Sequence, residues 1–209
     1  MHHLRFHHFE MSLGNTKQNN LFAKYAGRKD DEVDGARIGP NGVMKLLEDL
    51  GYSPEDRQVL ILCALTNAQT QCEFSHEEFV GFLSTKNIDT LANLKKFVDN
   101  FNRKMDTDES AFQEVYKFTF NYALIAGNKN LDIGSAITYW NILVTKNYKL
   151  FSVFMKFLQE GKSKPRGITR DVWNMFPEFL RTTKDIKDYD EMASWPSAFD
   201  DFVEFASEL

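Results

Sequence analysis

A cluster of acidic residues near the start of the chain has the spacing of a calcium-binding loop. In DDEVDGARIGPN, Asp30, Glu32, Asp34 and Gly35 take positions 1, 3, 5 and 6 of an EF-hand loop. Position 12, which normally supplies two oxygens from a glutamate, is Asn41. Because the ion loses that bidentate ligand, we expect a helix–loop–helix without tight calcium binding. A calcium-responsive EF-hand-like adaptor, or another helical adaptor, stays open as the alternative function.

The sequence does not indicate catalytic chemistry of its own. Cys72 has His76 four residues away, but a nucleophilic cysteine needs a base that a third group orients. A GKS tripeptide at 161–163 matches only the end of a P-loop, because Lys156 stands where the motif requires glycine and no strand precedes it. The residues therefore predict a protein that acts by holding other molecules, with no catalytic nucleophile, cofactor or metal.

The C-terminal end of the chain is strongly acidic. From Asp185 to Leu209 there are eight Asp and Glu residues and one base, Lys187, which gives a local charge of −7 against −5 for the whole chain. Charge of one sign on one surface steers a basic partner toward it. An acidic end that only aids solubility is the alternative. Within it, a helical apolar stripe is formed by Phe199, Phe202, Val203 and Ala206.

The composition limits the partners and the compartment. The longest apolar runs, such as Val59–Leu65, are far shorter than the ~20 residues that cross a bilayer, so no membrane partner is expected. The chain has no basic stripe of the kind that binds nucleic acid. Cys63 and Cys72 suit neither a disulfide framework nor a zinc site, which favours the reducing cytoplasm and/or nucleus.

The N-terminal end carries four of the five histidines, namely His2, His3, His7 and His8. A metal site needs ligands that converge on an ordered scaffold, and nothing here predicts one. We assign residues 1–18 to a disordered tail or to a remnant of an expression tag.

Helix signals dominate the remainder, and strand patterns are almost absent. Ser53, followed by Pro54, is predicted to cap a helix that begins at that proline. Ser75 and Glu78 have the spacing of a capping box. The sequence therefore predicts an all-α fold of roughly ten helices.

The second half of the chain also contains residues that are typical of helix starts and helix ends. Thr169 is predicted to cap a helix that Pro177 either ends or kinks. The polar segment Glu160–Gly167 is the best candidate for a boundary between a large helical part and the acidic C-terminal end. Another helix is predicted to present the stripe Ile133, Ile137, Trp140 and Val144.

Several blocks of the chain resemble the defective-in-cullin-neddylation family. They are TYWNILV at 138–144, RDVWNMF at 170–176 and YDEMASWPSAFDDFVEFA at 189–206, with TQCEFSHEEF at 70–79 and ARIGPNGV at 36–43 in the front half. The resemblance implies one potentiating neddylation domain over residues 19–207, EF-hand-like over 19–105 and helical over 106–207. Some members carry a ubiquitin-binding module ahead of this domain, for which we expect no room here.

The resemblance also implies a function. Members of the family act as scaffold-type ligases that promote cullin neddylation without an active-site nucleophile. One expected partner is the winged-helix domain at the cullin C-terminus, whose surface near the acceptor lysine is basic. The other is the neddylation conjugating enzyme, recognised through its N-acetylated methionine.

The motif matches imply a cullin-binding surface made of Asp171, Ser194 and Asp200. Both carboxylates are predicted in first turns of helices beside Trp195, where they could accept hydrogen bonds from Lys or Arg. The alternative is that they only complement helix dipoles, with Ser197 and Asp200 in a capping box. The family usually has alanine at the position of Ser194.

An acetyl-methionine pocket is the second implied site. Its apolar ligand suits such a pocket, because acetylation removes an ammonium group that is costly to bury. Without the resemblance, the same residues indicate ordinary core, and Pro40 and Thr66 depart from the family pattern. The acetyl amide would meet the carbonyl near Pro54 and the side chain of Gln71. The implied lining is Pro40, Val43, Val59, Leu62, Cys63, Phe74, Tyr122, Tyr139 and Ile142.

Overall fold

The computed structural model of the chain describes residues 16–33 and 37–209 and divides into two compact units. The first unit ends at Tyr122, and the second runs from Ala123 to Leu209. Both consist almost entirely of helices, which confirms the all-α prediction. The segment Glu160–Gly167 lies inside the second unit and is not its boundary. The described helices include none long and apolar enough to span a membrane. The four N-terminal histidines lie outside the described residues.

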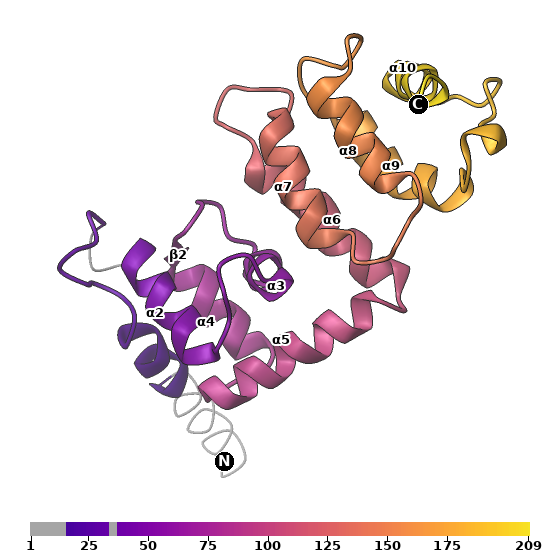
Figure 1. The fold of residues 1–209 in the computed structure, drawn as a ribbon. Coiled ribbons are helices and arrows are strands. Elements are labelled where there is room, and N and C mark those ends of the chain that lie inside the picture. Colours follow the sequence, from indigo (N-terminus) through magenta and orange to yellow (C-terminus); the bar gives the residue numbers. More distant parts are fainter. Residues whose placement is uncertain (1–15, 34–36) are drawn as a thin grey trace. The chain divides into compact units, whose positions relative to one another are not determined.

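The first unit contains a short antiparallel sheet, of which β2 is labelled in Figure 1. Strand β1 (Arg37–Ile38) pairs with β2 (Phe74–Ser75), so that Ile38 lies opposite Phe74. Each strand leads into a helix, β1 into α2 (Pro40–Leu50) and β2 into α4 (His76–Thr85). The intervening α3 (Arg57–Thr66) packs against α4 and α5 (Leu91–Met105). Helix α6 (Glu109–Ala123) follows α5.

The ordered part of the first unit begins before residue 19. Residues 16–23 are helical, although residues 16–18 were assigned to the N-terminal tail. Gln18 is buried and donates a hydrogen bond from Nε2 to the Ile88 carbonyl at 2.8 Å. Lys17 forms an ion pair with Asp89 at 2.9 Å. These contacts hold the helix on the turn between α4 and α5.

The capping box predicted at the start of α4 is confirmed. The Glu78 amide donates to Ser75 Oγ at 3.2 Å, and the Ser75 amide donates to Glu78 Oε2 at 2.6 Å. The other oxygen of Glu78 accepts a hydrogen bond from the Gln69 amide at 3.0 Å. One carboxylate therefore fixes both ends of the loop between α3 and α4.

We predict that Glu78→Gln lowers the free energy of unfolding by about 1–2 kcal/mol, because glutamine has only one acceptor oxygen for the two amides. Urea unfolding monitored by circular dichroism measures the change. Glu77→Gln is the matched control, since Glu77 is exposed in the same first turn and therefore has the same relation to the helix dipole. Equal losses in both variants would contradict the role of the hydrogen bonds.

The predicted start of α3 at Pro54 is wrong. Residues 54–56 form a turn in which the Ser53 amide donates to Asp56 Oδ2 at 2.8 Å, and the helix begins at Arg57. Arg57 donates from Nε to Asn102 Oδ1 at 2.6 Å and lies 2.8 Å from Asp106. This anchoring of Arg57 on α5 explains the later start, because it is a long-range interaction that a local capping rule does not include.

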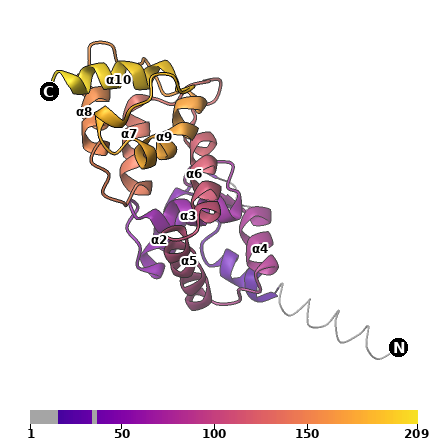
Figure 2. The same cartoon turned by 90° about the vertical axis from the view of Figure 1, so that its right-hand side faces the viewer.

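The second unit is built around an aromatic core. Its helices are α7 (Ile133–Leu143), α8 (Phe151–Glu160), α9 (Arg170–Thr182), the 3₁₀ helix η1 (Ile186–Asp188) and α10 (Ser197–Ser207). Trp140 of α7 stacks on Trp173 of α9 with ring centroids 5.1 Å apart, and Phe179 stacks on Phe199 at 4.4 Å. Phe202 adds contacts to Phe154. Helix α10 therefore packs on both α8 and α9 (Figure 2).

Two predictions about the second unit need correction. Helix α9 is capped by Thr169 as predicted, and of the two outcomes predicted at Pro177 the end of the helix is wrong, because α9 continues to Thr182. The loss of one backbone donor costs ~3 kcal/mol, and the buried aromatic side chains on both sides of the proline offset that cost. The buried stripe of α7 is Ala136, Trp140 and Leu143, whereas Ile133, Ile137 and Val144 are only half-buried.

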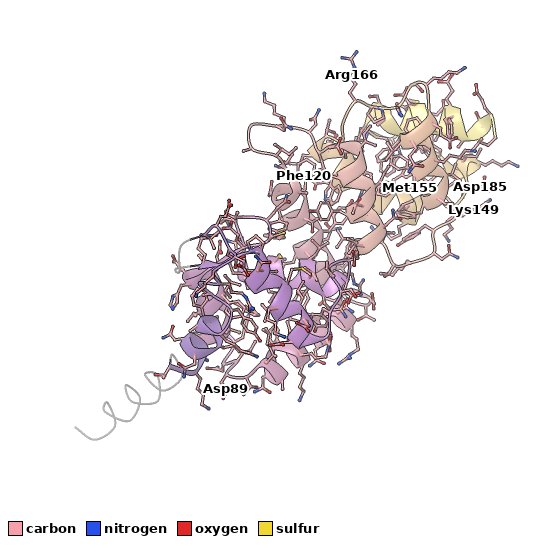
Figure 3. The ribbon with its side chains drawn as sticks, turned by 60° about the vertical axis from the view of Figure 1, so that its left-hand side comes forward. Asp89, Phe120, Lys149, Met155, Arg166 and Asp185 are labelled. Atoms are coloured by element: carbon pink, nitrogen blue, oxygen red, sulfur yellow. The ribbon has the colours of Figure 1, made fainter. Side chains whose placement is uncertain are left out.

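An ion pair fixes the segment between α9 and α10. Lys149, just before α8, pairs with Asp185 at the N-cap of η1, and the two side chains lie together in Figure 3. The pairing lowers the pKa of Asp185. It positions the start of the chain segment that carries Tyr189 and Trp195.

Candidate binding surfaces

Tyr122 is hydrogen-bonded to three other residues of the first unit. Its hydroxyl accepts hydrogen bonds from the Cys72 amide at 3.2 Å and from Cys63 Sγ at 3.5 Å. Its backbone carbonyl accepts one from Gln71 Nε2 at 2.8 Å. Burial raises the pKa of both Tyr122 and Cys63, that of the thiol to about 11. The phenol and the thiol are therefore neutral at physiological pH.

The apolar residues of the predicted pocket belong to the core of the first unit. Leu62, Cys63 and Phe74 are at most 5% exposed, and Val43 is 7% exposed. Val59 and Tyr122 are half-buried, so they are the parts of this set that solvent or a ligand can reach within the unit. Tyr139 and Ile142 are half-buried residues of α7, in the second unit.

The polar residues of the predicted pocket lie on the surface. Pro54 is exposed in the turn before α3, and Pro40 is exposed at the first position of α2. Gln71 is also exposed, and its bond to the Tyr122 carbonyl uses the amide nitrogen. That bond leaves Oε1 as an acceptor for an N–H group of a ligand.

A surface hollow of about 660 Å³ lies elsewhere in the first unit, next to the loop between α3 and α4. Thr66 lies on its floor with its hydroxyl bonded to the Leu62 carbonyl at 2.9 Å. The hollow shares no residue with the predicted acetyl-methionine pocket. Its lining is Leu65, Thr66, Asn67, Gln69, Ser75, Glu77, Glu78, Phe82, Thr85 and Lys86.

The acidic surface of the second unit is organised by a short hydrogen bond. Tyr189 donates from its hydroxyl to Asp200 Oδ1 at 2.5 Å. Burial and this bond to a carboxylate raise the pKa of Tyr189, so the tyrosine keeps its proton and acts as the donor. Its ring packs edge-on against Phe179 at 6.1 Å. The Asp200 carboxylate is therefore exposed but held in a defined position.

Trp195 lies beside this pair, and the predicted cullin-binding residues are distributed around it unequally. Its indole makes edge contacts with Phe179 at 5.7 Å and with Phe199 at 5.8 Å. Ser194 is exposed next to it. Asp171 is exposed in the first turn of α9, about two turns, or roughly 12 Å, before Phe179. Ser194 therefore adjoins a tryptophan that packs on Phe179 and Phe199, the residue before Asp200, whereas Asp171 lies at the opposite end of α9 from Phe179.

The capping alternative for Asp200 is only partly supported. Within the described chain, no side chain caps α10, and its N-cap is Pro196, so the box between Ser197 and Asp200 does not form. Asp200 still lies in the first turn, where a carboxylate complements the helix dipole. The hydrogen bond from Tyr189 is an additional constraint that capping does not require.

Two residues of the calcium-like loop, Asp30 and Asp31, are hydrogen-bonded to the start of α2. Asp31 is buried, and its carboxylate accepts from the amides of Asn41 at 2.7 Å and Gly42 at 3.2 Å. Asn41 Nδ2 donates to the Asp30 carbonyl at 3.0 Å. Asp34 and Gly35 lie outside the described residues. Among residues 16–33 and 37–209, no group of three or more His, Cys, Asp or Glu could hold a metal.

Two important residues were not singled out from the sequence. Asp31 caps α2 from ten positions away, and Tyr189 bonds to a carboxylate eleven positions away. Neither spacing belongs to a local capping rule. The tyrosine stands in the YDE block that carried the family resemblance, and that is the only signal that could have pointed to it.

The protein is thus helical, with the apolar residues of the predicted pocket in the core of the first unit, apart from half-buried Val59 and Tyr122, and with a hydrogen-bonded, exposed carboxylate at Asp200 in the second unit. A family model described as cullin binding matches residues 93–205. Defective in cullin neddylation protein 1 of Caenorhabditis elegans is 36% identical over 94% of this chain and 73% of its own length. The protein of that name in Yarrowia lipolytica is 34% identical, over 90% and 77%, and human DCN1-like protein 5 is 34% identical, over 88% and 74%.

The chain therefore belongs to the cullin-binding family, and within it to the defective-in-cullin-neddylation proteins. The family resemblance of the blocks at 138–144, 170–176 and 189–206 is confirmed.

Proposed function

We propose that this protein promotes the neddylation of cullins as a scaffold-type ligase. Family membership supports the role in neddylation, and the anchored Asp200 carboxylate is the structural observation that carries the cullin side of the proposal. The chain supplies no nucleophile in this proposal. It accelerates transfer by holding two reactants at high effective concentration in a productive orientation.

The proposed cullin surface consists of Asp171, Ser194 and Asp200. It receives basic side chains of the winged-helix domain at the cullin C-terminus. A charge-assisted hydrogen bond to a carboxylate contributes about 1.5–3 kcal/mol to the free energy of binding. Binding is more favourable when the carboxylate is already oriented, because less conformational freedom is lost. Tyr189 supplies that orientation by its bond to Asp200.

The proposed site for the conjugating enzyme lies in the first unit. The half-buried Val59 and the Tyr122 ring supply the reachable part of the apolar lining for an acetylated methionine, and Val43, Leu62 and Phe74 are its buried part. Gln71 Oε1 accepts the amide proton of that residue, because Gln71 Nε2 is already bonded to the Tyr122 carbonyl. The paired helix–strand–helix elements that position this site are proposed to be EF-hand-like in origin.

The proposed sites of action are the cytoplasm and/or the nucleus. Cys63 and Cys72 are both free thiols, and a reducing compartment keeps them in that state.

The proposal is tested by whether both partners bind at once. Isothermal titration of an N-acetyl-methionine peptide, carrying the N-terminal sequence of the conjugating enzyme, is performed on the protein alone and on the protein saturated with the cullin domain. We expect the two dissociation constants to agree within about twofold, because the two sites share no residue. Competition between the partners, or failure of either one to bind, would contradict the scaffold.

A further inference from the structure

Two loops of the second unit are tied together by their main chains. The Leu131 amide donates to the Ile168 carbonyl, and the Ile168 amide donates to the Leu131 carbonyl, both at 2.8 Å. A Cβ at Gly167 would come within 3.2 Å of both Asn130 Cβ and the Leu131 carbonyl oxygen, so glycine permits this close approach. Residues 124–131 and 161–168 therefore form one continuous edge of the unit.

The side chains of this edge are strongly basic. Residues 124–131 and 161–168 contain four bases and no acid, although the whole chain has a net charge of −5. All four basic side chains are exposed, and Arg166 projects outward from its loop (Figure 3). We refer to this set as the basic edge; its members are Lys129, Lys162, Lys164 and Arg166.

The charges of the basic edge are only partly offset by the acids that flank the two loops. Asp132 accepts a hydrogen bond from the Ser135 amide and keeps its charge, and Glu160 lies 4.0 Å from Lys156, so the edge with both acids retains an excess of positive charge. Lys164 donates to the Gln159 carbonyl at the end of α8. In the described part of the chain, Lys129, Lys162 and Arg166 have no carboxylate partner. Like charges gathered on an ordered edge repel one another, and an anionic ligand relieves that repulsion.

We propose that the basic edge binds a short acidic segment of a partner protein. The basic edge shares no residue with either surface of the proposed scaffold, although Asp171 lies five positions after Arg166, and the inference does not depend on that scaffold. A nucleic acid or a membrane surface extends well beyond four side chains, and the same unit carries the −7 charge of residues 185–209, which disfavours an extended polyanion. The two loops also contain no aromatic side chain on which a base could stack. A short peptide avoids both difficulties.

The test is fluorescence anisotropy with the whole protein and a labelled peptide of eight glutamates. We expect binding that weakens about tenfold between 50 and 200 mM salt, because a few exposed charge contacts are screened over that range. The variant Lys162→Glu/Arg166→Glu should weaken binding at least about tenfold. The control Lys86→Glu/Lys117→Glu makes the same change in net charge on exposed positions of the first unit and should leave the affinity within about twofold.

Thermal unfolding of all variants shows whether they are folded. Loss of binding in the first variant alone supports the proposal. No binding by the unaltered protein, or equal losses in both variants, overturns it. Tighter binding of a single-stranded DNA oligomer or of phosphatidylserine vesicles than of the peptide also overturns it, because the partner would then be a phosphate-bearing surface.

Discussion

An acetylated peptide from the conjugating enzyme should bind at least about 100-fold more tightly than the same peptide with a free amine, a difference of roughly 3 kcal/mol. The proposed site is apolar, and its titratable groups Tyr122 and Cys63 stay neutral because burial raises their pKa values. An ammonium group would therefore enter without an anionic partner. Titration of the two peptides into the unaltered protein measures the ratio.

Gln71 provides the matched test of that prediction. Gln71→Ala removes the proposed acceptor and should lower the affinity for the acetylated peptide by about tenfold. Gln69→Ala is the control, because Gln69 is exposed on the same loop and its side-chain amide donates to the nearby Asn67 carbonyl. Equal affinities for the acetylated and the free peptide would contradict the assignment of the pocket.

Reversing the charge of Asp200 should abolish most of the affinity for the cullin domain. Asp200→Lys removes an oriented carboxylate and places a cation opposite basic side chains, so we expect a loss of about 100-fold. Tyr189→Phe keeps the charge but removes the bond that orients it, and should cost about three- to tenfold. Surface plasmon resonance with the immobilised cullin domain measures both, and the acetylated peptide should bind all variants equally.

Glu204→Lys is the control for net charge, since Glu204 is exposed one turn farther along α10. It should leave the cullin affinity within about threefold. If Asp200→Lys leaves that affinity unchanged but lowers the stability of the protein, the carboxylate serves the dipole of α10, and the capping interpretation is correct.

Local rules predicted the parts of the fold that depend on neighbouring residues. The box of Ser75 and Glu78 and the cap at Thr169 each join residues three positions apart, and each was identified correctly. The apolar stripe of α10 was also correct at Phe199 and Phe202, which are fully buried. Such features need only the periodicity of a helix and the unsatisfied amides of its first turn.

Interactions between distant residues account for the errors. Helix α3 starts at Arg57 because that residue is anchored on α5, and a capping rule applied to Ser53 and Pro54 cannot include this contact. Helix α9 passes Pro177 because the rings on both sides of it pack into the aromatic core. The bond between Tyr189 and Asp200 likewise depends on how the segment before α10 folds back on α9.

The central claim is that this protein accelerates cullin modification by holding two partners, and a reconstituted reaction tests it directly. The rate of single-turnover transfer of the ubiquitin-like modifier from the charged conjugating enzyme to the cullin is measured with and without the protein. We predict an increase of at least about tenfold, which Asp200→Lys removes. Equal rates with and without the protein, at concentrations that saturate both partners, would contradict the account.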